Sequence, residues 1–252
     1  MKFEDHFSRL AREYSIYRPQ YPEALFKFLA GVAPETGLAW DCGTGNGQAA
    51  LQLAEHFQRV YATDASSKQI EQAAAYPGVE FKVESADNVS LESNSVDLVT
   101  VAVAVHWFNL AEFYREVNRV LKPAGVLAVW TYHLPQIEPA IDQVIYTYYR
   151  SVLGKYWPER IRYVDEKYET LPFPYQEFKP PPFEMHAVWD LNRLVGFLSS
   201  WSAVNGYQEK HGSHPLEAIW KDLRSAWGKE HVKREVRWEL YMRSGRKVDS
   251  KA

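Results

Sequence analysis

The feature that most constrains the fold is a glycine-rich stretch at residues 40–48, where a short apolar run ends at Asp41 and glycines occupy positions 43, 45 and 47. Helix-like spacing of apolar residues begins directly afterwards. Glycine lacks a Cβ, so the backbone can turn sharply here and lie close to a ligand. The amides at the start of the following helix would add hydrogen-bond donors and a partial positive charge. The stretch therefore predicts a strand, a tight ligand-binding turn and a helix.

A second apolar run, residues 60–63, ends at Asp64. A carboxylate at the carboxyl end of a neighbouring strand can accept hydrogen bonds from both hydroxyls of a ribose. Together with the glycine turn, this acid predicts a nucleoside-binding βαβ unit. Dinucleotide-binding turns place the third glycine one position later, where this chain has Gln48, and are therefore disfavoured. The alternative role for Asp64 is to cap the helix that follows it.

The first half of the chain continues to alternate between strand and helix patterns. Strands are predicted at residues 38–42, 59–63, 79–83, 97–105 and 126–130, and helices at 22–33, 48–56, 67–74 and 109–121. Residues 97–105 are almost continuously apolar and β-branched, which is typical of a central parallel strand buried on both faces. This alternation predicts an α/β fold with a Rossmann-like, doubly wound, mostly parallel sheet.

The rhythm changes after residue 131. Helices are predicted at 139–153, 191–201 and 216–227, a strand at 183–189, a loop with short helices at 154–182, and a polar loop at 205–214. Residues 236–242 alternate between apolar and polar side chains, which predicts an antiparallel last strand. We expect a single domain over 1–252, in which residues 132–182 form a helical cap over the substrate and residues 1–33 form N-terminal helices over the ligand.

Composition narrows the class of partner. The net charge is -3 and basic residues are not clustered, which speaks against nucleic acid and favours a small molecule. The single cysteine, Cys42, excludes an internal disulfide and leaves no cysteine cluster for a metal. No apolar stretch approaches the roughly 20 residues that span a bilayer, and the N-terminus lacks an apolar signal core. The chain is therefore expected to be soluble and cytoplasmic, without a membrane partner.

A series of motifs lies between residues 20 and 131: Asp41-x-Gly43-x-Gly45-x-Gly47, Asp64, Ser85-Ala86, the strand at 97–105, and Leu121-Lys122-Pro123-x-Gly125. In order and spacing they resemble the class I S-adenosylmethionine-dependent methyltransferases. Two further segments, Tyr17-Arg18-Pro19-x-Tyr21-Pro22 and residues 104–108, look like the small-molecule subgroup that includes the trans-aconitate methyltransferases. That subgroup often has Gln in place of Val103 and Asp in place of Asn109.

The resemblance implies S-adenosylmethionine as the cofactor and assigns roles by motif. The implied cofactor contacts are Arg18, Asp41, Gly43 and Gly45 at the methionine end, Asp64 and Ala65 at the ribose, Ser85 and Ala86 at the adenine edge, and Val103. The implied substrate contacts are Tyr17, Trp107, Tyr132 and Trp201. His106 would be the catalytic residue that faces the transferable methyl.

The implied reaction is methyl transfer to a small molecule without a metal, with O-methylation of a carboxylic acid favoured. A carboxylate is already ionised at neutral pH, whereas a hydroxyl must first lose a proton to a base. Two other classes stay open: a methyltransferase that acts on tRNA or protein, and a cofactor-binding regulatory protein without turnover. His106 could instead satisfy a buried backbone carbonyl, and the aromatic residues could belong to the core. The acceptor and the oligomeric state are left undetermined.

Overall fold

A computed structural model describes residues 19–248 of the chain. The described residues fall into two compact units, and each unit combines segments that are distant in sequence. The sheet unit contains Tyr21–His133, Arg162–Glu184 and the residues from Glu239 onward, and the helical unit contains Pro19, Gln20, Leu134–Ile161 and Met185–Trp238. The predicted cap at 132–182 is therefore divided between the two units. The predicted cofactor contacts from Asp41 to Val103 all belong to the sheet unit.

The sheet has the strand order β3-β2-β1-β4-β5-β8-β6, and β7 pairs with β8. The strands are β1 (Leu38–Cys42), β2 (Arg59–Asp64), β3 (Val79–Val83), β4 (Val96–Ala102), β5 (Leu121–Tyr132), β6 (Gln176–Phe178), β7 (Phe183–Trp189) and β8 (Arg234–Arg246). Strands β1 to β5 pair in parallel, whereas β8 runs antiparallel to β5 and β6. The predicted mostly parallel sheet with an antiparallel last strand is confirmed. Its order reverses between β1 and β4, the point at which open α/β sheets bind ligands.

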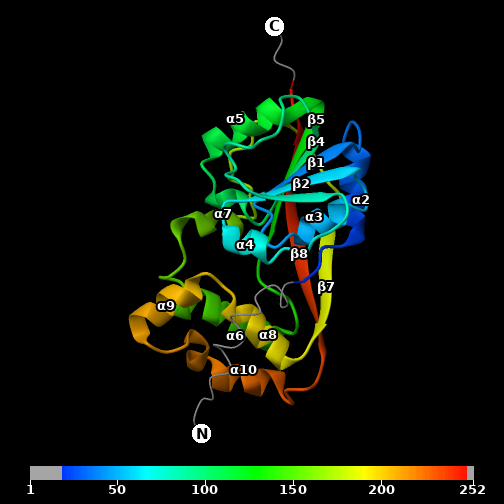
Figure 1. The fold of residues 1–252 in the computed structure, drawn as a ribbon. Helices are drawn as coiled ribbons and strands as arrows, with labels where there is room; N and C mark the ends of the chain where they lie inside the picture. The colour runs from blue at the N-terminus through cyan, green and yellow to red at the C-terminus, as the bar shows by residue number, and fades with distance from the viewer. Residues whose placement is uncertain (1–18, 249–252) are drawn as a thin grey trace. The chain divides into compact units, whose positions relative to one another are not determined.

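Helices cover both faces of the sheet in the sheet unit. Figure 1 shows α2 (Glu23–Val32) and α3 (Gln48–Leu53) on one side and α5 (Leu110–Val120) on the other. Two short helices, α4 (Ser67–Glu71) and α7 (Arg162–Asp165), complete the unit with the 3₁₀ turn η2 (Val105–Trp107). β1 is buried along its whole length and β4 is buried up to its last residue. Strands covered on both faces need such continuous apolar runs.

A buried acid joins the starting ends of β1 and β4. Asp97 is fully buried, and its Oδ2 accepts hydrogen bonds from the amides of Gly37 at 3.0 Å and Leu38 at 2.9 Å. Its Oδ1 lies 2.7 Å from Nζ of Lys122. Burial of a carboxylate is costly unless the group is both paired and hydrogen-bonded, as it is here. Lys122 of the Leu-Lys-Pro motif therefore has a structural role far from the glycine turn.

The helical unit has a largely aromatic core. Its helices are α6 (Pro139–Thr147), the π-helical turn η3 (Tyr148–Val152), η4 (Glu159–Ile161), α8 (Leu191–Ser199), α9 (Ala203–His211), η5 (Pro215–Ala218) and α10 (Trp220–Trp227). Trp201 stacks on Tyr148 with ring centroids 5.6 Å apart, and Trp189 meets Trp238 edge-on at 4.8 Å. Across residues 19–248, no helix combines the length and the apolar character needed to cross a membrane.

Several predicted boundaries are wrong, and one predicted loop is a helix. Residues 203–211 form α9, although residues 205–214 were expected to be a loop, because the burial of Ala203 and Val204 stabilises an otherwise polar helix. The predicted helix at 139–153 becomes π-helical after Thr147. The helices predicted to end at residues 56 and 74 end at Leu53 and Glu71. Strand β5 begins at Leu121 rather than at residue 126, and β6 lies in the predicted loop at 154–182. The predicted N-terminal helix falls mostly at residues 1–18, outside the described residues.

Strand β4 also ends earlier than predicted, at Ala102, because Val103 adopts a left-handed backbone conformation with φ of 54°. A β-branched residue is strained in this region, and such strain is concentrated at functional sites. The amide of Val103 donates to the carbonyl oxygen of Trp130 at 2.8 Å, and η2 follows directly. The strained residue therefore turns the chain away from the sheet.

Replacing Val103 by Asn should raise the free energy of unfolding by about 1 kcal/mol, because Asn tolerates the left-handed region and strain of this kind costs about 1–3 kcal/mol. Urea unfolding of the ligand-free protein measures the change. Val103→Thr is the matched control, because Thr is also polar but keeps the β-branched shape, and it should give no gain. If Val103→Asn is no more stable than Val103→Thr, the backbone at residue 103 does not destabilise the natural protein.

Candidate functional site

The glycine turn places its glycines in the left-handed region, with φ of 67° at Gly43, 58° at Gly45 and 92° at Gly47. Residues with a side chain rarely adopt this conformation. Space is also restricted at Gly43, where a Cβ would lie 2.7 Å from the Cβ of Ala104 and 3.0 Å from the ring of Phe108. The backbone that follows β1 therefore passes directly beside the segment that follows β4.

Asp41 is fully buried immediately before the turn. Its Oδ2 accepts a hydrogen bond from Oγ1 of Thr44 at 2.6 Å, and its Oδ1 accepts one from Oγ1 of Thr100 at 2.8 Å. Burial raises the pKa of Asp41 to about 6, and the two threonine hydroxyls offset part of that shift. Asp41 thus ties the glycine turn to β4 through neutral donors.

Asp64 lies at the carboxyl end of β2, beside the turn. Its Oδ2 accepts a hydrogen bond from the amide of Gly45 at 2.9 Å, and its Oδ1 accepts one from the amide of Ser66 at 2.9 Å. The second bond is a turn just before α4 rather than a helix cap, because Ser66 is the N-cap of α4 and no side chain caps that helix. The same residue lines the adjoining cavity, as ligand binding requires. Asp64 is therefore placed for a ligand and does not cap α4.

A cavity of about 360 Å³ opens where the segments after β1, β2, β3 and β4 meet. Its lining includes the acidic residues Asp64, Glu84 and Asp87 and three aromatic residues from the segment after β4 and from α5. Among residues 19–248 the lining is Gly43, Asp64, Ala65, Glu84, Ser85, Ala86, Asp87, Ala104, Trp107, Phe108, Asn109 and Phe113. An apolar cavity of this size with a few convergent polar groups suits a small ligand or cofactor.

The cavity brings together six of the predicted site residues: Gly43, Asp64, Ala65, Ser85, Ala86 and Trp107. The sequence assigned no ligand role to Glu84, Asp87, Ala104, Phe108, Asn109 or Phe113, although they also line it. The signal that could have found most of them is adjacency, because Glu84 and Asp87 flank Ser85-Ala86, and Phe108 and Asn109 follow Trp107. Phe113 lies one helical turn further along α5 and had no such signal.

Six other predicted residues lie in the described part of the chain and are not in this lining. Asp41, Gly45, Val103, His106 and Tyr132 belong to the same sheet unit but are absent from the lining. Trp201 belongs to the helical unit. Tyr17 and Arg18 lie outside the described residues. Their assigned contacts stay predictions.

His106 is enclosed beside the cavity wall, with 3% of its surface exposed, whereas its neighbour Trp107 is 44% exposed. Its Nδ1 lies 2.8 Å from the hydroxyl of Tyr168, and its ring centroid lies 4.7 Å from that of Trp107. Burial lowers the pKa of His106 to about 4, so the ring is neutral at physiological pH. Within the described part of the chain, the partner of the ring is therefore a phenol rather than the backbone carbonyl of the structural alternative.

The buried Asp41 should give the ligand-free protein a distinctive pH dependence. Its folded pKa of about 6 lies above the ordinary value of 3.8, so the folded state binds the proton more tightly. This stabilisation is fully present below about pH 4 and is lost as the pH rises through 6. From pH 4 to pH 7, the natural protein should lose up to about 3 kcal/mol of unfolding free energy that Asp41→Asn does not lose. Parallel stability curves for the two proteins would contradict this assignment.

Known proteins resemble this chain over most of its length. The methyltransferase domain family matches residues 40–129. A protein of Dictyostelium discoideum named as a methyltransferase is 33% identical over 230 residues, which cover 90% of this chain and 88% of that protein. A Saccharomyces cerevisiae relative, named as an S-adenosylmethionine-dependent methyltransferase, is 27% identical over 241 residues and covers 80% of this chain and 82% of the relative.

A solved structure supports the same assignment. The structure of a type II methyltransferase from Anaeromyxobacter dehalogenans has a TM-score of 0.84 and 43% sequence identity, and the match covers 91% of this chain and 97% of that one. The likeness therefore extends over both the sheet unit and the helical unit. Together with the sheet order, the glycine turn and the acid at the end of β2, it shows that the chain belongs to the class I S-adenosylmethionine-dependent methyltransferases and is an enzyme that uses S-adenosylmethionine as its cofactor.

Proposed function

We propose that this methyltransferase methylates a carboxylate oxygen of a small organic acid. The observation that carries the proposal is the buried hydrogen bond between Nδ1 of His106 and the hydroxyl of Tyr168. The resemblance of residues 17–22 and 104–108 to a small-molecule subgroup supports the same class of acceptor.

The cavity in the sheet unit fits the nucleoside part of the cofactor. Gly43 lines the cavity without a side chain that would project into it, and Asp64 supplies two carboxylate oxygens for the ribose hydroxyls. Ser85, Ala86 and Asp87 form a wall suited to the adenine edge. The bound cofactor supplies an activated methyl group on a sulfonium. The chain's own contribution is to hold the reactants in line and to exclude water.

His106 is suited to donate a hydrogen bond rather than to remove a proton. Burial raises the pKa of Tyr168 well above its ordinary value, so its hydroxyl keeps its proton and can donate it to Nδ1 of His106. The neutral imidazole then carries its own proton on Nε2. In the proposed complex, Nε2–H would donate to an oxygen of the acceptor, and Tyr168 would hold the ring in that tautomer.

This arrangement favours an acceptor that is already ionised. A general base is most effective when its pKa lies near the working pH, and the pKa of His106, about 4, is too low for a hydroxyl acceptor. A carboxylate, with an ordinary pKa near 4, needs no base. A hydrogen bond from Nε2–H would orient one carboxylate oxygen while the other attacks the methyl.

Labelled S-adenosylmethionine should transfer its methyl to members of a panel of small carboxylic acids, and not to phenols, amines, tRNA or protein. With the acid identified, His106→Gln should keep more activity than His106→Ala by about tenfold, because the amide retains an N–H donor worth about 1–2 kcal/mol. Label that appears only on amines or nucleic acid would exclude the carboxylate. Equal losses in the two variants would show that the ring acts as a base.

Asp64→Ala should weaken the binding of S-adenosylhomocysteine by at least about tenfold, because a hydrogen bond to a charged group contributes about 1.5–3 kcal/mol. Isothermal titration calorimetry measures the affinity without an acceptor. Glu80→Gln is the control, since Glu80 is an exposed acid on the neighbouring strand β3 and does not line the cofactor cavity. Unchanged affinity in Asp64→Ala would assign the ribose to another group.

A further inference from the structure

The wall of the cofactor cavity depends on a segment that has no helix or strand of its own. Residues 84–95 connect β3 to β4, and they carry Glu84, Ser85, Ala86 and Asp87 of the cavity lining. Loops of this length without secondary structure are uncommon in compact domains, and ordering each residue costs conformational entropy. Specific contacts must therefore hold residues 84–95 in place.

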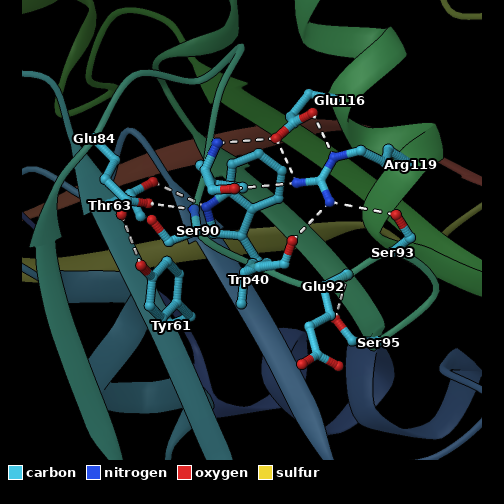
Figure 2. A network of polar contacts seen from close by, with 12 residues as sticks. Trp40, Tyr61, Thr63, Glu84, Ser90, Glu92, Ser93, Ser95, Glu116 and Arg119 are labelled. Carbon is cyan, nitrogen blue, oxygen red and sulfur yellow. Dashed lines mark hydrogen bonds and ion pairs between the residues drawn. The ribbon is translucent and has the colours of Figure 1, made fainter.

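The side chain of Arg119 on α5 supplies three of these contacts. Its Nη1 donates to the carbonyl oxygen of Leu91 at 2.7 Å and to Oγ of Ser93 at 3.5 Å, and its Nη2 donates to the carbonyl oxygen of Val89 at 3.1 Å. Its Nε and Nη2 also donate to Glu116, at 2.9 Å and 2.7 Å. Arginine has five N–H donors in a fixed planar fork, and here each of them has a partner. Figure 2 shows the guanidinium between Glu116 and the loop backbone.

Glu116 completes the contact from the same helix. Its Oε1 accepts a hydrogen bond from the amide of Val89 at 2.9 Å as well as from Arg119, so both polar groups of the Val89 backbone are bound by one ion pair. The Glu116 side chain is 9% exposed and that of Arg119 is 36% exposed. Partial burial and paired hydrogen bonds make such an ion pair stronger than one on the open surface.

A second contact closes the loop at its other end. Glu84 accepts hydrogen bonds from the hydroxyl of Tyr61 and from the amide of Ser90, both at 3.0 Å (Figure 2). The segment that contains Ser85, Ala86 and Asp87 therefore lies between two fixed points, the Glu84 carboxylate and the Val89 backbone. A shift of either point would move the wall that faces the cofactor.

We infer that Glu116 and Arg119 are positioning residues for S-adenosylmethionine, which hold the adenine-side wall in its binding geometry without lining the cavity. The inference goes beyond the proposed acceptor, because it concerns cofactor binding alone. The same helix provides a matched control. Arg115 and Glu112 form an ion pair with the same spacing, but Arg115 is 70% exposed and Glu112 is 38% exposed.

The test compares Arg119→Ala, Arg119→Lys and Glu116→Gln with Arg115→Ala in the full chain. Calorimetry with S-adenosylhomocysteine should show affinity about tenfold weaker in Arg119→Ala and within about twofold of the natural protein in Arg115→Ala, since residues outside a site change binding by amounts of this order. Arg119→Lys should recover only part of the affinity, because its ammonium has three donors on one atom and cannot reproduce the fork.

Hydrogen exchange of the cofactor-free proteins separates positioning from general destabilisation. In Arg119→Ala the amides of residues 85–91 should exchange about tenfold faster while those of β1 and β4 are unchanged, and added S-adenosylhomocysteine should restore protection. Uniformly faster exchange with unchanged affinity, or equal affinities in Arg119→Ala and Arg115→Ala, would overturn the inference. If Arg119→Ala fails to fold, Arg119→Lys and Glu116→Gln are judged by the same two measurements.

Discussion

The close approach of two backbone segments at Gly43 is the constraint on which the site depends. No side chain fits there, because a Cβ would lie 2.7 Å from the Cβ of Ala104. Parallel pairing of β1 with β4 brings their carboxyl ends to one edge of the sheet, and the glycine allows the segments beyond those ends to touch. Asp64 can then reach the amide of Gly45 from β2. The cofactor cavity is the space that this arrangement leaves.

Buried acids hold β1 against β4 at both ends, but with different consequences. At the starting end, Asp97 accepts backbone hydrogen bonds and pairs with Lys122, so its charge has a cationic partner. At the cavity end, Asp41 is held by two neutral hydroxyls, and burial raises its pKa to about 6. At the end of β1 and β4 remote from the cavity, the buried charge of Asp97 is therefore balanced by Lys122. At the end beside the cavity, the ionised form of Asp41 is destabilised by burial, and Val103 is strained; such strain is concentrated at functional sites.

Two ion pairs on helix α5 show that the same sequence spacing contributes differently to stability at different positions in the fold. Glu112 with Arg115 and Glu116 with Arg119 have the same spacing, but the first pair is exposed and the second lies against the backbone of residues 89–91. Exposed pairs contribute about 0–1 kcal/mol. The pair of Glu116 and Arg119 also makes hydrogen bonds with the backbone of residues 89–91. Without these hydrogen bonds, the backbone groups of the loop would lose their partners and the loop would be less ordered.

The amino-acid sequence by itself determined the sheet, the glycine turn and the acid at the end of β2, because these depend on local patterns of burial and on the conformational freedom of glycine. It also determined the antiparallel last strand, through the alternation of residues 236–242. It could not determine that β4 ends at Ala102 or that residues 203–211 are helical, since apolar and polar runs do not report a left-handed φ or a few buried contacts. Only the tertiary structure joined His106 to Tyr168 and Arg119 to Leu91, because these partners are distant in sequence and meet through packing.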